Sequence, residues 1–180
     1  AIGAARVYPS VRVTGLDFVN PVLHAGLRKS EKAHLAGRVR FLKGDALALP
    51  FHDNTFDVAA VAFGIRNIPD RLRALAEMRR VVVPGGQVLV LEMTFPRRNP
   101  FRSAYRFYLQ QVLPRLGRAF SNNPGAYEYL GDSIMNFPDP DAFSGEMERV
   151  DLTRIQKYAL DFGITYLHMG MKSAPLSLSS

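Results

Sequence analysis

Residues 56–70, FDVAAVAFGIRNIPD, are the stretch of sequence that decides the fold. Its first part, Phe56–Phe63, is a short and almost wholly apolar run bounded by turn residues. Such a run is typical of a strand that is buried on both faces of a parallel sheet. Gly64 then permits a sharp turn, and two strong hydrogen-bond donors, Arg66 and Asn67, follow at once. We therefore expect a central strand that ends in a polar loop.

This loop has two interpretations, a ligand site and an ordinary surface loop. Open α/β sheets bind their ligands at the carboxyl ends of parallel strands, which is where Arg66 and Asn67 lie in the sequence. The alternative is a buried strand followed by a loop whose arginine is simply solvated. The stretch alone leaves both open.

Around this strand the chain alternates strands with helices at short spacing, which predicts βαβ units and a parallel sheet. Right-handed crossovers place the carboxyl ends of all parallel strands at one edge, so polar residues after different strands share a rim. We expect Asp17, Asp45, Arg66, Asn67 and Glu92 on that rim. The predicted fold is α/β, a doubly wound and mostly parallel sheet with a C-terminal antiparallel hairpin. The expected strands are 11–17, 39–43, 56–63, 88–91, 154–160 and 164–169, and the expected helices are 21–35, 71–83 and 139–148.

Composition limits the class of protein. With 180 residues, 47% of them hydrophobic, we expect one domain over residues 1–174 and a flexible tail at 175–180. No long uncharged apolar run and no cysteine occurs, which excludes a disulfide framework and suits a cytoplasmic protein. A net charge of +7 is compatible with nucleic acid, an anionic membrane surface or anionic cofactors as partners.

Residues 96–135 interrupt the strand–helix rhythm, and we expect them to form a helical cap. Within it, 101–120 mixes aromatic and apolar residues with arginines, and Pro114 is expected to interrupt the helix. Basic and aromatic residues on one helix favour contact with a membrane surface, here through residues 97–118. The alternative is that the aromatic residues pack on the sheet while the arginines face water.

Two acidic residues on the rim suit an adenosine ligand. Asp17 ends a strand where a carboxylate can accept hydrogen bonds from both ribose hydroxyls. Asp45 can accept from an adenine amine, while the neighbouring Ala46 N–H can donate to a ring nitrogen. The alternatives are an acid that serves a helix dipole and an ordinary turn aspartate. No GxGxxG loop, P-loop, nucleophile elbow or metal-binding histidine cluster occurs, so no metal site is expected.

Several segments together resemble one family, the UbiE-type C-methyltransferases of ubiquinone and menaquinone biosynthesis. FGIRN at 63–67 is close to that family's signature, and Tyr127-Glu128-Tyr129-Leu130 is a further narrow match. The resemblance spans essentially the whole chain. The longer matching segments are GLDFVNPVL (15–23), GDALALPFHDNTFDVAAVAFGIRNIPD (44–70), EMRRVVVPGGQVLVLEMTFP (77–96) and FGITYLHMGMK (162–172).

The resemblance implies transfer of a methyl group from S-adenosylmethionine (SAM) to a ring carbon of a reduced, polyprenylated quinone precursor. It assigns Asp17 to the SAM ribose and Asp45 with Ala46 to the adenine. Many members have Ser or Thr where this chain has Ala62, so a side-chain contact to SAM is lost there.

The same resemblance places Arg66 and Asn67 beside the substrate ring. Arg66 would stabilise the phenolate and Asn67 would orient the hydroxyl. Tyr127 and Tyr129 would close the pocket, and Tyr129 and His168 are the candidate bases. The implied substrate is the lipid quinol, and we also expect contact with the inner membrane face. A homodimer is one option for the oligomeric state, which the sequence leaves open. No nucleic acid is expected, because the basic residues are spread along the chain and no recognition motif occurs.

One departure from the family limits these implications. Its first strand and the glycine loop after it precede the helix in which this chain begins, and neither occurs in the sequence. In such sheets that strand lies between the strands ending at Asp17 and Phe63. We therefore expect the 180 residues to be a fragment of a longer protein. We expect this fragment to bind SAM weakly or not at all.

Other functions stay open at this stage. A methyltransferase of another phenolic small molecule fits the same rim, and assays with quinol precursors would separate the two. An NAD oxidoreductase is disfavoured because its glycine motif is absent. A basic lipid- or nucleic-acid-binding module would show salt-dependent binding that survives changes at Asp17 and Asp45. The prenyl length and the choice between ubiquinone and menaquinone precursors are undetermined.

Overall fold

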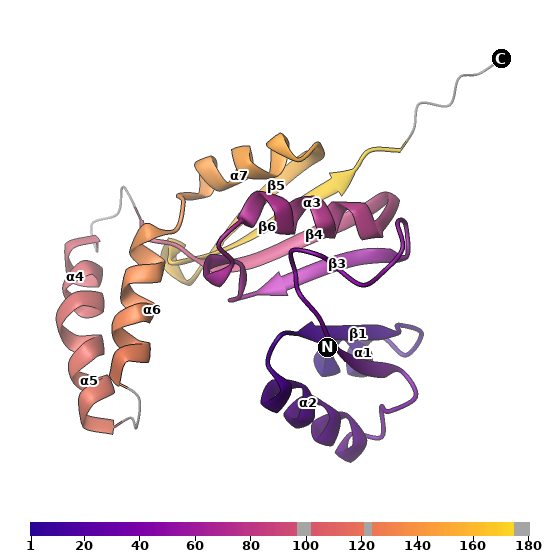
Figure 1. Ribbon diagram of the computed structural model, residues 1–180. Helices are drawn as coiled ribbons and strands as arrows, with labels where there is room; N and C mark the ends of the chain where they lie inside the picture. Colours follow the sequence, from indigo (N-terminus) through magenta and orange to yellow (C-terminus); the bar gives the residue numbers. More distant parts are fainter. Residues whose placement is uncertain (97–101, 121–123, 175–180) are drawn as a thin grey trace. The chain divides into compact units, whose positions relative to one another are not determined.

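The structure is a computed structural model that describes residues 1–96, 102–120 and 124–174 (Figure 1). These residues group into two compact units, Ala1–His52 and Asp53–Ser180, and each unit is described by itself. The single domain expected over 1–174 stays a prediction.

The first unit is a βαβ arrangement preceded by a short helix. Its two strands are parallel and in register from the pair Val13–Val39 to the pair Asp17–Lys43. Buried Ala5, Leu35 and Val39 form its core. The predicted strand–helix–strand order is therefore confirmed. The elements are α1 (Ile2–Val7), β1 (Val13–Asp17), α2 (Asn20–Lys32) and β2 (Val39–Lys43).

The ends of α2 differ from the prediction. The helix begins at Asn20, one residue before the predicted start, and its N-cap Val19 has no side-chain cap; the Asp17 carboxylate accepts a hydrogen bond from the Val19 amide. The helix ends at Lys32, three residues before the predicted end at residue 35. His34, with φ of 56°, supplies the left-handed residue that commonly follows a helix end.

The second unit is built on a four-stranded sheet in the order β3-β4-β6-β5. β3 is parallel to β4, while β6 is antiparallel to both β4 and β5, so three of the four strands run in one direction. The expected C-terminal hairpin is thus β5 and β6. The strands are β3 (Phe56–Ala62), β4 (Val82–Met93), β5 (Leu152–Leu160) and β6 (Thr165–Lys172).

The strands form two sheets rather than one. Within the described residues β1 pairs only with β2, and β3 pairs along one edge only, with β4. The strand expected between them is not supplied by residues 1–96, 102–120 or 124–174. The predicted fold class, α/β with mostly parallel strands and an antiparallel hairpin, is nonetheless confirmed.

Helices α3 (Arg71–Val81) and α7 (Pro140–Arg149) cover the sheet of the second unit (Figure 1). Asp70 and Asp139 cap them, each accepting backbone N–H groups of the first turn. An Arg71–Glu146 ion pair of 2.9 Å joins the two helices. Their apolar faces meet the sheet in one core, which contains Ile65, Leu75, Met78, Val82, Val88, Val90, Phe137, Phe143, Met147 and Leu152.

Between β4 and α7 the chain forms a separate helical segment (Figure 1). The expected interruption at Pro114 is wrong, because the chain stays helical through that point and widens into a π-helix just before it. Proline has no N–H to donate to the carbonyl four residues earlier, and a wider turn relieves this mismatch. No described helix is both long and apolar enough to cross a membrane. The elements are α4 (Arg102–Phe107), the π-helix (Tyr108–Val112), α5 (Leu113–Phe120) and α6 (Pro124–Asn136).

His168 of β6 is buried in the core, 1% exposed, with its ring against Phe143 at 4.9 Å between centroids. Its Nε2 lies 3.0 Å from the Pro140 carbonyl oxygen and so carries the proton. Its Nδ1 is buried and has no hydrogen-bond partner among the residues that the structure describes. Burial lowers the pKa of His168 below its ordinary value of 6.5, because a charged imidazole is poorly solvated there.

We expect acidification to destabilise the second unit through His168. The unfolded chain binds this proton more readily than the folded protein, so the free energy of unfolding falls as pH drops below 6.5. The slope contributed by one group is at most about 1.4 kcal/mol per pH unit. Urea unfolding between pH 7.5 and 5 should show this dependence, and His168→Gln should flatten it.

The exposed His24 provides the control for this experiment. His24→Gln should keep the wild-type pH dependence. Equal slopes for wild type and His168→Gln would contradict the assignment.

Candidate active site

The FGIRN stretch folds into a strand end followed by one short turn of 3₁₀ helix, η1 (Ile65–Asn67). Phe63, rather than Gly64, adopts the left-handed conformation, with φ of 55°. Gly64 has φ of −125°, and a Cβ there would make a tight contact of 3.2 Å with Val61 Cγ2. Ile65 is fully buried in the core and anchors the turn.

Arg66 is held by a buried ion pair with Glu92, the last charged residue of β4. Arg66 Nη1 lies 2.6 Å from Glu92 Oε1, and the Arg66 backbone N–H donates to Glu92 Oε2 at 3.3 Å. The two side chains are 10% and 1% exposed. Arg66 Nε also donates to the Ser133 hydroxyl of α6 at 3.3 Å, and Nη1 donates to the Phe63 carbonyl. One side chain therefore ties β3, β4 and α6 together.

The pairing changes what Arg66 offers to a substrate. The Glu92 carboxylate neutralises its charge in a water-poor environment, so the pair acts on a nearby anion less strongly than a free guanidinium would. The sequence placed Glu92 on the rim without predicting this contact. The signal was available in the sequence, since a lone carboxylate that ends an apolar strand needs a cation.

Asn67 and Tyr129 are in direct contact at the surface of the second unit. The Tyr129 hydroxyl donates to Asn67 Oδ1 at 3.1 Å, which leaves the Asn67 amide hydrogens directed elsewhere. Tyr129 is 55% exposed, and Asn67 is also exposed. Arg66, Asn67 and Tyr129, the three predicted catalytic residues, therefore lie together, with the outer two accessible to a ligand.

Two other residues proposed for this site lie elsewhere. Tyr127 packs inside the helical segment, where a Cβ on Gly117 of α5 would lie 2.7 Å from its ring. His168 is in the core below α7. Neither position supports a direct role in closing a pocket or abstracting a substrate proton.

In the first unit, Asp17 and Asp45 follow adjacent parallel strands and form matching turns. Asp17 Oδ1 accepts from the Val19 amide at 2.8 Å, and Asp45 Oδ1 accepts from the Leu47 amide at 2.8 Å. The Gly44 amide donates to the Asp17 carbonyl at 3.1 Å, which joins the two strand ends. Each carboxylate is thus fixed through one oxygen, and among the described residues the other oxygen has no hydrogen-bond partner.

This arrangement suits an adenosine group chemically. A fixed carboxylate with a free oxygen accepts hydroxyl or amine hydrogens at little entropic cost. Ala46 follows Asp45 directly and is half-buried, and its contact with adenine stays a prediction. Within the residues that the structure describes, no group of three or more His, Cys, Asp or Glu side chains could hold a metal ion.

Comparison with known proteins identifies the family. The model of the ubiE/COQ5 methyltransferase family matches residues 3–172. The chain belongs to this family.

Relatives and solved structures agree with the assignment to the ubiE/COQ5 family. A demethylmenaquinone methyltransferase of Thermus thermophilus is 44% identical over 162 residues, which are 90% of this chain and 72% of the relative. One of Bacillus cereus is 39% identical over 94% of this chain and 71% of the relative. The predicted family and enzyme class, a methyltransferase, are therefore confirmed.

The fold matches solved methyltransferases at low sequence identity. An O-methyltransferase family protein of Burkholderia thailandensis has a TM-score of 0.65 at 22% identity, covering 96% of this chain and 47% of that one. The S-adenosylmethionine-dependent methyltransferase SibL has a TM-score of 0.64 at 20% identity, with 96% and 47% covered. These likenesses support the SAM-methyltransferase fold.

We expect Glu92→Gln to destabilise the second unit severely. It removes the carboxylate charge and leaves the buried Arg66 cation uncompensated, which costs about 3–5 kcal/mol. The double change Arg66→Met/Glu92→Leu removes both charges and should cost less than Glu92→Gln alone. Urea unfolding of the three proteins measures the difference.

Asp53→Asn is the matched control, because it removes one carboxylate from the exposed Arg80–Asp53 pair. It should change the free energy of unfolding by less than about 1 kcal/mol. An equally small effect of Glu92→Gln would show that the buried pair is not required.

Proposed function

We propose that this protein transfers a methyl group from SAM to a ring carbon of a demethylmenaquinol-type lipid quinol. The observation that carries the proposal is the 44% and 39% identity to proteins named demethylmenaquinone methyltransferase, over nine-tenths of the chain. The corresponding ubiquinone precursor belongs to the same chemical class. The accessible Asn67–Tyr129 pair at the end of β3 supports an acceptor that carries a ring hydroxyl.

The first unit supplies the residues for the cofactor. The free carboxylate oxygens of Asp17 and Asp45 would accept from the ribose hydroxyls and the adenine amine, and the Ala46 N–H would donate to the ring. When bound, SAM supplies an electrophilic methyl group on a sulfonium. The chain's task is to hold the two reactants in line, which gives a large part of the rate enhancement of bimolecular reactions.

The residues around Asn67 would act on the acceptor. Loss of the quinol hydroxyl proton makes the adjacent ring carbon nucleophilic, and the carbon–carbon bond forms as the carbon–sulfur bond breaks. The ring then loses the hydrogen at that carbon. The Asn67 amide would donate to the phenolate oxygen, because its own oxygen is already engaged by Tyr129. Arg66, held by Glu92, keeps this turn in place.

The direct test is methyl transfer to a defined quinol by the protein expressed from its own gene. Radiolabelled SAM and chemically reduced demethylmenaquinone should give a product of one added methyl group, located on the ring by mass spectrometry. Asp17→Ala and Asp45→Ala should each raise the dissociation constant of SAM about tenfold or more, since hydrogen bonds to a charged group are lost.

Two controls decide the outcome of this assay. Glu31, exposed on α2 in the same unit, provides Glu31→Ala, which should bind SAM as the wild type does. Methylation of simple phenols but not of the quinol would overturn the proposed substrate. A lack of any SAM-dependent methyl transfer would overturn the proposed reaction.

We expect Asn67→Ala to lower kcat about 100-fold while leaving SAM affinity unchanged, as removal of one donor to a developing oxyanion does. Tyr129→Phe should have a smaller effect, because it removes only the contact that orients the amide. Steady-state kinetics with saturating quinol measures both changes.

Asp70→Ala is the control for effects transmitted through the same loop, since it removes the cap of α3 without touching Asn67. It should lower stability and leave kcat near the wild-type value. Full turnover in folded Asn67→Ala would contradict the role given to the amide, and full turnover in folded, SAM-bound Arg66→Ala would exclude Arg66.

A further inference from the structure

The helical segment has an inner face that packs and an outer face that does not. Leu109, Leu113 and Ile134 are buried in a small core of their own, against Met93 and Phe95 at the end of β4. This contact fixes which side of α4 and α5 points away from the sheet. The outward side still carries large apolar groups, namely Phe107, Tyr108 and Leu116, which are 61%, 41% and 42% exposed.

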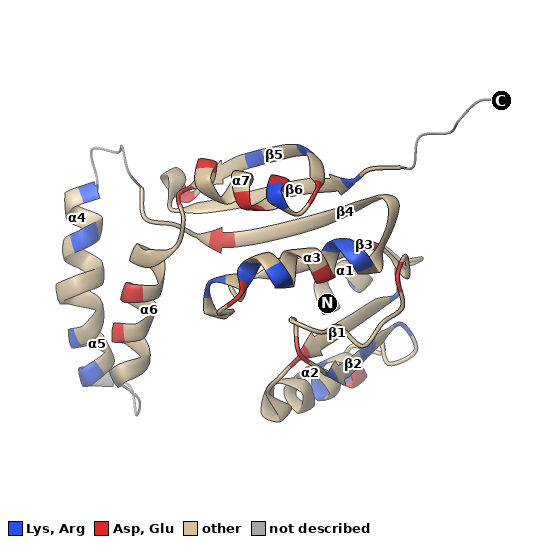
Figure 2. Ribbon diagram, turned by 45° about the horizontal axis from the view of Figure 1, so that its top comes forward, with Lys and Arg blue, Asp and Glu red and all other residues tan. Residues whose placement is uncertain are grey.

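Arginines accompany these exposed apolar groups. Arg102, Arg106, Arg115 and Arg118 are all exposed, and residues 102–120 contain no Asp or Glu. Figure 2 shows basic residues alone on α4 and α5, whereas the acidic residues of the segment lie on α6. We call these seven exposed residues of α4, the π-helix and α5 the basic-aromatic face. Arg97 and Arg98, also expected to contribute, lie outside the described residues.

Internal contacts do not neutralise the charge of three of these arginines. Within the part of the chain that the structure describes, Arg106, Arg115 and Arg118 form no ion pair. Arg115 donates to the Gln111 carbonyl at 2.6 Å, and Arg118 Nε to the Pro114 carbonyl at 3.4 Å. These bonds use part of the hydrogen-bonding capacity of each guanidinium but do not neutralise its positive charge.

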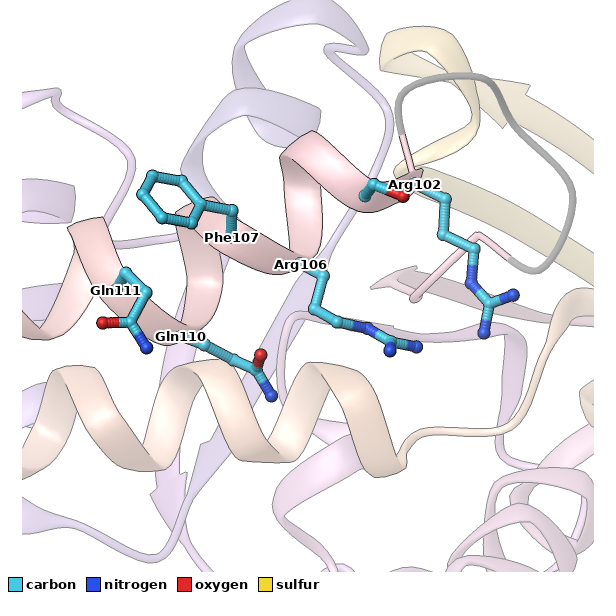
Figure 3. A pocket seen from close by; sticks show the side chains of 6 residues that line it. Arg102, Arg106, Phe107, Gln110 and Gln111 are labelled. Carbon is cyan, nitrogen blue, oxygen red and sulfur yellow. The ribbon is translucent and has the colours of Figure 1, made fainter.

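A hollow runs along the face at α4 and the π-helix. It has a volume of about 450 Å³ and is lined by residues of 102–111. Figure 3 shows Arg102, Arg106 and Gln110 extending from the same side of the helix, with Phe107 on another. Both arginines also lie over the ring of Phe95, at 5.5 and 5.4 Å. Aromatic support of this kind holds two guanidinium groups near each other despite their repulsion.

We propose that the basic-aromatic face docks the protein on a bilayer of anionic phospholipid. The arginines contact headgroup phosphates, with the hollow receiving one of them, while Phe107, Tyr108 and Leu116 enter the headgroup–acyl boundary. Charge complementarity selects this partner, since the face is uniformly basic and the cytoplasmic leaflet is negative. The inference deepens the proposed function, because a polyprenylated quinol resides in the bilayer.

The apolar groups favour a bilayer over nucleic acid. Phosphate contacts in nucleic-acid complexes need only cations and hydrogen-bond donors, and bases stack on aromatic rings. Exposed Leu116 serves neither purpose. A helical segment whose exposed side chains are arginines together with aliphatic and aromatic residues instead matches the water–lipid boundary.

The test is co-sedimentation of the protein with vesicles. Vesicles of phosphatidylcholine and phosphatidylglycerol in equal amounts should bind it, and vesicles of pure phosphatidylcholine should bind it far more weakly. Raising salt from about 0.1 M to about 1 M shortens the screening length from about 10 to about 3 Å and should weaken binding. Arg106→Gln/Arg115→Gln should reduce the partition coefficient roughly 25-fold.

A second variant keeps the inference testable if that double variant folds poorly. Phe107→Ser changes an exposed side chain and should weaken binding at both salt concentrations alike. Lys29→Gln/Lys32→Gln removes two exposed charges from α2 and is the matched control, which should bind normally. Equal binding of wild type and Arg106→Gln/Arg115→Gln, or preference for RNA over vesicles, would overturn the inference.

Activity separates this inference from the proposed function. Arg106→Gln/Arg115→Gln should methylate a short-chain, water-soluble quinol at the wild-type rate but a long-chain quinol in vesicles more slowly. Methyl transfer without vesicle binding would overturn only the docking inference. Vesicle binding without methyl transfer to either quinol would overturn only the proposed function.

Discussion

The buried ion pair between Arg66 and Glu92 is the interaction on which the rest of the site depends. Its two residues end neighbouring strands, and Arg66 reaches from them to Ser133 of α6. Neither charge is tolerable there alone, because removing an ion from water costs several kcal/mol unless a partner compensates it. The pair thus requires β3, β4 and α6 to be assembled together. The position of the loop therefore depends on the assembled sheet.

The ion pair gives the residues of the FGIRN loop different structural roles. Ile65 is buried in the core, and Arg66 forms the ion pair with Glu92. Asn67 lies at the surface and contacts Tyr129. A guanidinium that is paired with a buried carboxylate stabilises a substrate anion only weakly, but it holds the loop rigidly in place. In the proposed reaction the neutral amide of Asn67 would meet the developing oxyanion, and its contact with Tyr129 would set its geometry before any ligand arrives.

The sequence predicted the strands of the second unit, because periodicity and strand ends are local signals, whereas the family resemblance placed Arg66, Asn67 and Tyr129 at one site. It failed where packing decided the outcome. The left-handed residue is Phe63 rather than Gly64, and a Cβ at position 64 would lie within 3.2 Å of Val61 Cγ2. The sequence indicates that Glu92 needs a cation, but it does not show that Arg66 is that cation, because the two residues are 26 positions apart and meet only in the folded sheet.

The helical segment is another case in which packing decided what the sequence could not predict. Its sequence mixes arginines with aromatic residues, and two assignments of that mixture were possible: rings packed inward with arginines in water, or both turned outward together. The structure contains each in part. Tyr105 packs inward against Phe95, and burial raises its pKa to about 12, whereas Phe107 faces out beside Arg106. Two aromatic residues two positions apart fall on different sides of a helix, since successive residues turn by about 100°. Packing against α6 and against the end of β4 determines which of those sides is buried, so the outward chemistry of the segment follows from these contacts.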